Sequence, residues 1–390
     1  METKTFWKWD DSVTEKLFSI RKHLHQYPEL SFKEHQTSLY IQDWLNQWGI
    51  PFKVVCETGV VVDITGEAGD GPNIALRADI DALPIREESG LDFASRNKGV
   101  MHACGHDGHT TILLGAVYHI WKYKSQLKGM VRCIFQPGEE ALGAAEKMIK
   151  AGVLSQPEIN NMVALHLWPK IPEGTIGTKT GAVTAASDDF KIEVKGKSGH
   201  AARPHEGIDT ITIGSKIVDA IEYYTTEWKD PVDPLVIHVG KMHGGKAKNV
   251  IADQVILEGT IRSISSETRE KLRKEFPVFV KNIAKDFGGE AAVDYREGLP
   301  AVINDPDTTE KINKAAWAMI GKKNVLELDS VSMGSDDFGF FAEKVPSCYF
   351  RLGVRDEKGE NFDLHHPKFQ FNEEVIPIGS KILIQYVFDR

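Results

Sequence analysis

The alternation of short apolar runs with helical segments between residues 52 and 168 most constrains what this chain can fold into. Apolar runs of strand length recur along this stretch, bounded by polar or turn residues. Segments with helical spacing follow at 109–124 and 141–152. The strand-like runs are FKVVCE, GVVVDITG, NIALRADI, MVRCIFQ and NMVALHLW. Strands alternating with helices predict an α/β domain with a mostly parallel sheet flanked by helices.

The pattern changes near residue 183, where the alternation typical of antiparallel strands begins. Four strand-like runs and two helical segments follow, and the α/β pattern returns after about residue 298. This order predicts a small α+β (ferredoxin-like) domain, with its helices on one face, inserted into a larger domain. We therefore expect one domain from residues 1–183 and 298–390, and an inserted domain at 184–297.

Charge and cysteine content exclude several classes of function. The 390 residues carry a net charge of -9, which gives no reason to expect nucleic acid or an anionic membrane as a partner. No apolar run approaches the roughly 20 residues of a membrane span, and the first residues lack the features of a signal peptide. Four widely spaced cysteines are no disulfide framework. We expect a cytoplasmic protein with reduced thiols.

Side chains that bind metals recur directly after the expected strands. They are Asp79 and Asp81 in LRADIDALP, Cys104, His106 and Asp107 in HACGHD, Glu139 and Glu140 in QPGEE, His166 in VALHLWP, and His365 and His366 in LHHPKF. Ligands of parallel α/β folds bind outside the carboxyl ends of the strands, so these segments are expected at one edge of the sheet. A thiolate can bridge two metals, and the expected helix N-terminus near Cys104 favours the thiolate.

Each of these residues also has an ordinary structural explanation. A single histidine at a strand end is more often a hydrogen-bonded polar residue, and a Glu-Glu pair is usually solvated. His102, Asp107 and His109 could cap a helix. The occurrence of sulfur, nitrogen and oxygen ligands together favours a metal site. Of two adjacent glutamates, one can hold a metal while the other takes a proton from water.

Six motifs, in order, make the chain resemble the M20 family of metallo-amidohydrolases over nearly its whole length. They are RADIDALP, HACGHDGH, QPGEE, HLWP, SGHAARPHEG and LHHPKF. The resemblance is to the aminoacylase branch, which includes auxin-conjugate hydrolases, hippurate hydrolases and N-acetyl-diaminopimelate deacetylases. It implies two divalent metal ions per subunit, zinc or manganese, or else nickel or cobalt.

The resemblance also implies roles for individual residues of the metal site. Cys104 would bridge the two metals, and His106, Glu140, His166 and His365 would complete the ligands. Glu139 would be the general base, and Asp81 would orient a ligand. His365 is preferred to His366 because the family's ligand follows the leucine of an LH-x-P pattern.

For the inserted domain, the resemblance implies a lid that forms a homodimer. His200, in SGHAARP, would reach the active site of the neighbouring subunit and polarise the scissile carbonyl. Asn249 and Arg262 would hold the substrate carboxylate, although Arg262 could also be a surface charge on a strand. Ser335, Asp336 and Asp337, in SMGSDDFGFF, could line the substrate pocket or cap a helix.

The expected substrate is a small molecule, an N-acyl amino acid. The expected activity is metal-dependent hydrolysis of its amide bond to a carboxylic acid and a free amino acid. A dipeptidase or aminopeptidase of the same superfamily is the alternative. A cysteine hydrolase with Cys104 as nucleophile would be insensitive to chelators. A structural zinc site in a binding protein would usually have several closely spaced cysteines, which this chain lacks.

Overall fold

The computed structural model describes residues 6–141, 143–230, 232–356, 359 and 362–389. The chain divides into two compact units, each considered by itself. The first unit consists of Met1–Val183, Ile303–Ser330 and Asp337–Arg390, and the second of Thr184–Val302 and Val331–Asp336. Leu142, within the helix expected at 141–152, lies outside the described residues.

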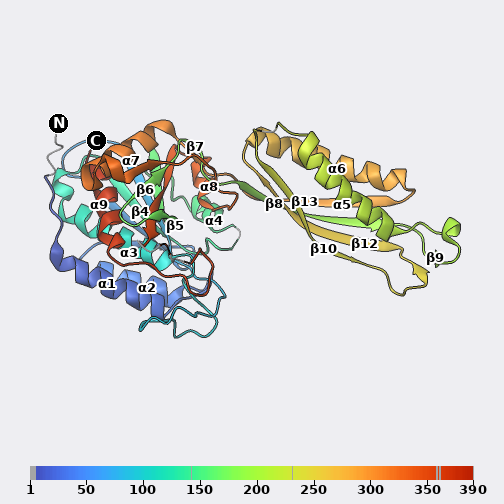
Figure 1. Cartoon of the computed structure of the whole chain (residues 1–390). Helices are drawn as coiled ribbons and strands as arrows, with labels where there is room; N and C mark the ends of the chain where they lie inside the picture. The colour runs from blue at the N-terminus through green and yellow to red at the C-terminus, as the bar shows by residue number, and fades with distance from the viewer. Residues whose placement is uncertain (1–5, 142, 231, 357–358, 360–361, 390) are drawn as a thin grey trace. The chain divides into compact units, whose positions relative to one another are not determined.

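A mixed eight-stranded sheet forms the centre of the first unit (Figure 1). In spatial order its strands are β1 (Lys53–Val55), β2 (Gly59–Thr65), β4 (Met130–Gln136), β3 (Asn73–Asp79), β5 (Asn161–Pro172), β16 (Ser347–Arg355), β6 (Ile176–Thr178) and β15 (Val325–Glu327). The neighbours β4–β3, β3–β5, β5–β16 and β6–β15 are parallel. The pairs β1–β2, β2–β4 and β16–β6 are antiparallel.

The centre of this sheet is therefore parallel, as predicted, whereas antiparallel pairs occur on both sides of it. Only residues 56–58 join β1 to β2, and so short a connection can form a hairpin but no parallel crossover. The central strands β3 and β4 are buried along nearly their whole length, as expected where helices cover both faces of parallel strands. Their side chains, such as Leu76 and Val131, belong to the main hydrophobic core.

Helices flank this sheet, which confirms the predicted α/β class. They are α1 (Asp11–Gln26), α2 (His35–Gln47), α3 (His106–Lys122), α4 (Ala144–Lys150), α7 (Pro306–Ile320), α8 (Phe338–Ala342) and α9 (Val375–Phe388). Helix α3 packs against both α1 and α9, and α7 packs against α9. Short elements complete the unit: β7 (Gly181–Ala182) with β14 (Ile303–Asn304), and the 3-10 turns Lys124–Gln126 and Lys322–Asn324.

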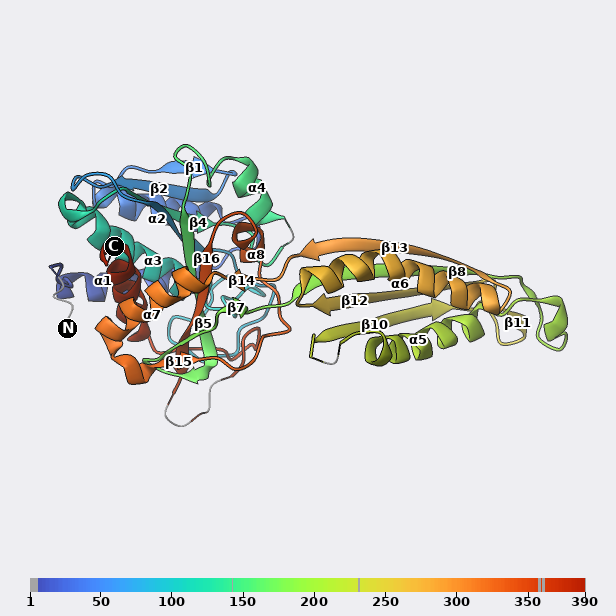
Figure 2. The same cartoon turned by 90° about the horizontal axis from the view of Figure 1, so that it is seen from above.

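The second unit has the ferredoxin-like order of strand, helix, two strands, helix and strand (Figure 2). Strands β8 (Ala186–Lys195), β10 (Leu235–Gly244), β12 (Gln254–Ser263) and β13 (Glu290–Leu299) form an antiparallel sheet in the order β10-β12-β8-β13. Helices α5 (Thr210–Glu227) and α6 (Ser266–Asp286) pack against it. Burial alternates along β8, as expected for a sheet covered on one face. This confirms the predicted α+β architecture.

A two-stranded ribbon extends from this second sheet. It pairs β9 (Gly199–His200) with β11 (Val250–Ile251), and the 3-10 turn Pro204–Glu206 follows β9. The ribbon carries two of the residues predicted to bind substrate.

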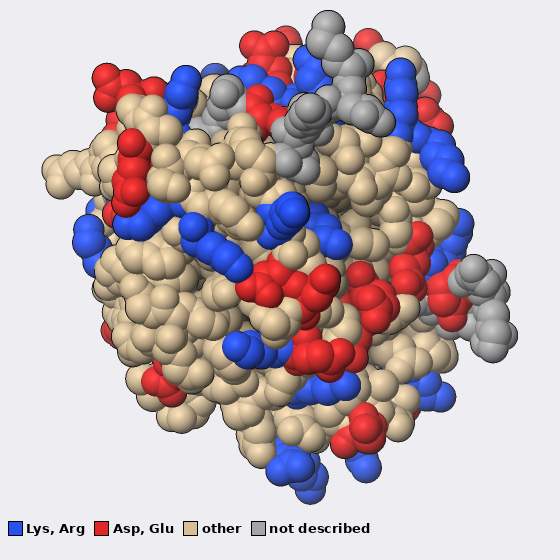
Figure 3. All heavy atoms as spheres, turned by 90° about the vertical axis from the view of Figure 1, so that its left-hand side faces the viewer, with Lys and Arg blue, Asp and Glu red and all other residues tan. Residues whose placement is uncertain are grey.

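Three further features concern the surface charge, the helices and the cysteines. Figure 3 shows lysine and arginine side chains interspersed with acidic ones on one face, where acidic groups gather near the middle and right. Within the described part of the chain, no helix has the length and apolarity needed to cross a membrane. All four cysteines are free thiols.

Candidate metal centre

The carboxyl ends of three neighbouring strands bring the predicted ligands together. In the sheet register Asp79 pairs with Gln136 and Arg77 with Ala164, so Asp79 at the end of β3 lies level with His166 on β5. The loop after β3 carries Asp81, and the loop after β4 carries Glu139 and Glu140. Helix α3 begins at His106 rather than at the predicted residue 109, so this histidine occupies the first turn.

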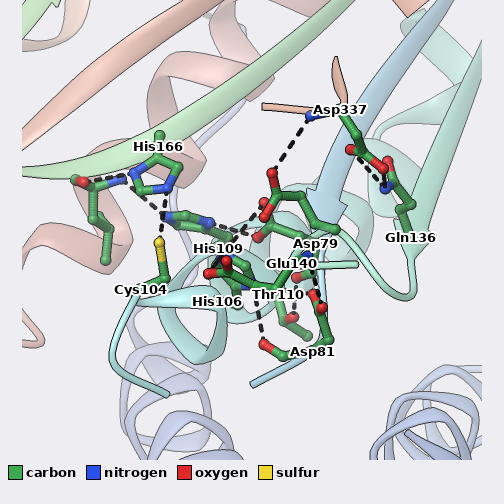
Figure 4. Close-up of polar contacts among 12 residues, drawn as sticks. Asp79, Asp81, Cys104, His106, His109, Thr110, Gln136, Glu140, His166 and Asp337 are labelled. Carbon is green, nitrogen blue, oxygen red and sulfur yellow. Dashed lines mark hydrogen bonds and ion pairs between the residues drawn. The ribbon is translucent and has the colours of Figure 1, made fainter. Parts of the chain in front are cut away.

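The first ligand triplet consists of Cys104, His106 and His166. Their ligand atoms all lie within 4.8 Å of one another, and all three residues are buried. Sγ of Cys104 is 3.4 Å from Nε2 of His166 (Figure 4). Gly105 connects the first two with φ 84°, a left-handed conformation that glycine adopts without strain. This turn places a thiol and an imidazole side by side at the helix start.

The second triplet consists of Cys104, Glu140 and His365, whose ligand atoms also lie within 4.8 Å of one another. Nε2 of His365 is 3.2 Å from Oε1 of Glu140. The backbone of His365 has φ 63°, which is costly for a residue with a side chain, and its N–H donates to the carbonyl of Ala103. Its neighbour His366 stacks instead on Phe362. Cys104 is thus the member that both triplets share.

Hydrogen bonds fix the tautomers of both buried histidines. Nδ1 of His106 lies 2.9 Å from the carbonyl oxygen of Asp81 and 3.2 Å from its Oδ1. Nδ1 of His166 lies 2.7 Å from the carbonyl oxygen of Leu167. Both Nδ1 atoms must therefore donate, which directs the Nε2 atoms at the cluster. Among the described residues, Nε2 of His106 is buried without a hydrogen-bond partner. This is the arrangement of metal-bound imidazoles.

Asp81 also joins the ligands to each other. Its Oδ2 accepts hydrogen bonds from Oγ of Ser31 at 2.7 Å and from the main-chain N–H of Glu140 at 3.0 Å. One carboxylate therefore orients the ring of His106 and the loop of Glu140.

The electrostatics of the cluster favour a cation. Burial opposes the charged imidazolium of His106, but the carboxylates of Asp79 and Asp81 outweigh burial and raise its pKa to about 10. Burial, followed by the charges of Glu140 and Glu139, raises the pKa of the Cys104 thiol well above its ordinary value. Cys104 does lie directly before the start of helix α3, as predicted, and the thiolate itself stays a prediction. A bound cation would supply the missing positive charge.

Glu139 lies beside the ligands without belonging to either triplet. Its carboxylate forms a cluster with His106 and Glu140, with oxygen and nitrogen atoms within 4.8 Å. Oε1 of Glu139 is 3.4 Å from the main-chain N–H of Asp337. The Asp337 carboxylate is in turn held by Nη2 of Arg77 at 2.9 Å and by Nε2 of Gln136. Buried contacts thus fix the segment that contacts Glu139, and Figure 4 shows the side chain of Asp337 against Gln136.

Sequence reasoning missed the role of Asp79 and left His109 as a helix cap. Oδ1 of Asp79 is 2.6 Å from Nδ1 of His109, and Oδ2 is 2.7 Å from Nη1 of Arg77. His109 stands three residues after His106 on the same helix face, a spacing that could have indicated a shared site. Asp107 is no helix cap either: its Oδ2 lies 3.0 Å from Nε of Arg21.

The predicted substrate-binding residues of the second unit lie at two separate ends of its sheet. His200 and Asn249 are exposed on the β9–β11 ribbon, where the carbonyl of Asn249 accepts from the N–H of Ala201. Arg262 is near the other end of β12, opposite Ser187. Ser335 follows Gly334, whose carbonyl accepts from the N–H of Ala185, so it lies near that same end. Among the described residues, Nη1 of Arg262 is buried without a hydrogen-bond partner.

Comparisons with known proteins agree with this geometry. A family model described as peptidase family M20/M25/M40 matches residues 75–389. The N-acetyl-L-cysteine deacetylase of Bacillus subtilis (strain 168) is 40% identical over 375 residues, or 96% of this chain and 88% of the relative. Thermostable carboxypeptidase 1 of Saccharolobus solfataricus is 39% identical over 370 residues, or 93% of this chain and 92% of the relative.

A solved structure extends the likeness to the fold. The Bacillus subtilis YxeP protein, described as a dinuclear metal-binding peptidase from the M20 family, matches with a TM-score of 0.85 and 33% identity. The match covers 97% of this chain and 99% of that one. The family model and these relatives confirm the resemblance seen in the six motifs, and the chain belongs to peptidase family M20/M25/M40.

Proposed function

We propose that this hydrolase cleaves the amide bond of N-acyl amino acids to a carboxylic acid and a free amino acid. The observation that carries the proposal is the membership of Cys104 in two ligand triplets, with the carboxylate of Glu139 beside them. A residue that belongs to both triplets could hold two neighbouring metal ions at once. A separate carboxylate is what a proton transfer to and from the reacting groups requires.

The residues fit two divalent metal ions. One would be held by Cys104, His106 and His166, and the other by Cys104, Glu140 and His365. When bound, such ions supply Lewis acidity that activates water and polarises the scissile carbonyl. The mixture of thiolate, imidazole and carboxylate suits zinc or manganese, and nickel or cobalt could also bind.

In this proposal Glu139 is the general base and Asp81 a positioning residue. An oxygen of the Glu139 carboxylate takes a proton from the attacking water and delivers it to the nitrogen of the leaving amine. The N–H of Asp337, 3.4 Å from Oε1 of Glu139, helps to keep this carboxylate in place. Asp81 holds His106 with its Nε2 free for a ligand.

Residues of the second unit would bind the rest of the substrate as part of a homodimer. Arg262 comes eight positions after Gln254, which lies next to the ribbon, and eight steps of an extended strand span roughly 26 Å. A small N-acyl amino acid cannot reach both ends. We therefore propose that Arg262 and Ser335 serve one site while His200 and Asn249 serve that of a second copy. Arg262 and Asn249 would hold the substrate carboxylate, and His200 would polarise the carbonyl.

Two alternatives differ in the support that they have. Carboxypeptidase activity is favoured by the 39% identity to thermostable carboxypeptidase 1, because the same site could cleave a peptide bond. A cysteine nucleophile is disfavoured because burial lowers the pKa of His166 well below its ordinary value. With the raised pKa of Cys104, this opposes a thiolate–imidazolium pair.

The decisive experiment combines metal analysis with product assays. Elemental analysis of the purified protein should find about two divalent ions per chain. Release of free amine should be measured with N-acetyl, N-benzoyl and indole-acetyl amino acids and with dipeptides, before and after chelation. Chelator-sensitive hydrolysis of N-acyl amino acids would support the proposal, and preference for dipeptides would favour the peptidase. Activity of a metal-free protein would contradict both. We also propose, from its free thiols, that the protein works in the cytoplasm.

A further inference from the structure

Arg351 stands in the same row of the sheet as the metal centre, although no motif drew attention to it. In the register of β5 and β16, Arg351 is the direct partner of His166. His166 is in turn level with Asp79, as derived above. Direct partners in neighbouring strands direct their side chains to the same face of a sheet. The guanidinium of Arg351 therefore lies on the face that carries His166.

The environment of this guanidinium lacks a counter-charge. Arg351 is only 5% exposed, and its Cζ lies 3.9 Å from the ring centroid of Trp168. Nη2 donates to the carbonyl of Val183 at 3.3 Å, while Nε is buried without a hydrogen-bond partner among the described residues. No ion pair to a carboxylate is found for Arg351 in that part of the chain. Burial accordingly lowers its pKa from the ordinary value.

A buried cation without a partner is costly to a folded protein, and an aromatic face offsets only part of the cost. Arg77, two strands away, shows the usual solution in this same sheet. It pairs with Asp79 at 2.7 Å and with Asp337 at 2.9 Å. Arg351 is buried as Arg77 is, but it has no carboxylate partner among the described residues. It also lies beside His166, a candidate metal ligand.

We propose that Arg351, supported by Trp168, binds a carboxylate of the substrate that is remote from the scissile amide. This inference rests on the proposed function and names a substrate class, namely N-acyl amino acids that carry a second carboxylate besides the α-carboxylate. The second carboxylate could belong to a dicarboxylic acyl group or to an acidic amino-acid side chain. In either case the planar fork of the guanidinium would receive it through paired hydrogen bonds.

Pairs of substrates that differ in the second carboxylate test the proposal. For each substrate, kcat/KM is measured with the metal-loaded enzyme. N-succinyl-L-alanine is compared with N-acetyl-L-alanine for the acyl side, and N-acetyl-L-glutamate with N-acetyl-L-glutamine for the amino-acid side. R351Q should lower kcat/KM for one of the dianionic substrates by roughly 10- to 100-fold. Its monoanionic counterpart, which has only the α-carboxylate, should change by less than about 3-fold. R351K should recover part of the loss, because it keeps the charge but not the fork.

R355Q is the matched control, since Arg355 is an exposed arginine on the same strand. It should leave all four values unchanged. A loss in R351Q that is equal for dianionic and monoanionic substrates would show a structural role and overturn the proposal. Unchanged values for all substrates would overturn it too.

A binding measurement separates this inference from the proposed function. Calorimetric titration with glutarate and with acetate needs no turnover, and both anions can reach a metal. The wild-type protein should bind glutarate more tightly than acetate, and R351Q should lose that difference. If none of the amides is hydrolysed, the proposed function fails. The titration then still shows whether Arg351 binds a carboxylate. Equal glutarate binding by wild type and R351Q would contradict the anion site.

Discussion

His109 and Asp79 form a buried hydrogen bond of 2.6 Å between Nδ1 and Oδ1, while Nε2 of the same ring accepts the N–H of Leu167 at 2.9 Å. Because Nε2 accepts, Nδ1 must be the donor, so the two contacts fix which ring nitrogen faces Asp79. The contact joins β3, α3 and β5 immediately beside His166. A histidine that is not itself in the shared triplets thus sets the position of a ligand-bearing strand.

The first prediction concerns Asp79→Asn. The carboxylate also pairs with Arg77 at 2.7 Å, and Asp79 is fully buried. Its neutralisation leaves Arg77 with less compensating charge, so we expect a loss of about 3 kcal/mol in the free energy of unfolding. Urea denaturation measures this loss. Asp219→Asn, at an exposed ion pair with Lys216, should change the free energy by less than about 0.5 kcal/mol. Equal effects in the two variants would refute the importance of the buried contact.

The second prediction uses the adjacent pair Glu139 and Glu140. Glu139→Gln should retain the metal ions but lower kcat by roughly 100- to 10,000-fold, because the amide cannot accept the proton. Glu140→Gln should instead lose metal, because it belongs to the second triplet. Metal content and kcat of both purified variants separate the roles. A Glu139→Gln enzyme with near-normal kcat would show that another group is the base.

The third prediction concerns Cys104→Ser. Since both triplets share this thiol, its replacement by a poorer ligand should reduce the content of both ions and abolish activity. Elemental analysis after dialysis provides the measurement. Cys56→Ser, at a half-buried thiol outside the triplets, should keep both. An unchanged metal content in Cys104→Ser would argue against a shared ligand.

Much of the fold followed from local patterns because its elements are regular. Apolar runs such as NIALRADI and MVRCIFQ are the buried strands β3 and β4, and the alternation after residue 183 marks the antiparallel sheet of the second unit. Because the ends of parallel strands lie at one edge of a sheet, the sequence predicted that Asp81, Glu139 and Glu140 meet there. These predictions needed only periodicity and the geometry of parallel sheets.

Other features depend on register and on long-range contacts, which local patterns do not contain. Arg351 matters because β16 lies beside β5, yet about 180 residues of chain separate the two strands. The link from Asp337 to Glu139 likewise joins segments distant in sequence. The antiparallel edge of the first sheet depends on the direction of β2, which an apolar run alone cannot specify. The precise roles of His109 and Asp79 follow only once β3 and α3 are placed together.

The last prediction concerns stability against pH through Glu34. This residue is fully buried, and its Oε1 accepts from the N–H groups of Phe32 and Gly138 at 2.8 Å, while Oε2 accepts from Oγ1 of Thr58 at 3.0 Å. Burial, which outweighs these hydrogen bonds, raises the pKa of the Glu34 carboxyl above its ordinary value. The folded state therefore holds this proton to a higher pH than the unfolded state does.

The sign of the effect follows from that difference in proton binding. Between the unfolded and the folded pKa, the folded state binds more protons, so stability falls as pH rises through this range. Glu34→Gln cannot lose a proton, and its amide can keep the same geometry by accepting from both N–H groups and donating to Thr58. We expect the variant to be more stable than the wild type at about pH 8, with a difference that shrinks as the pH falls towards about 4.5. Urea denaturation across this range tests the expectation, and exposed Glu343→Gln serves as the control. A variant that is less stable than the wild type at about pH 8 would show that the buried carboxylate is favourable as an anion, because its three donors would then outweigh the cost of burial.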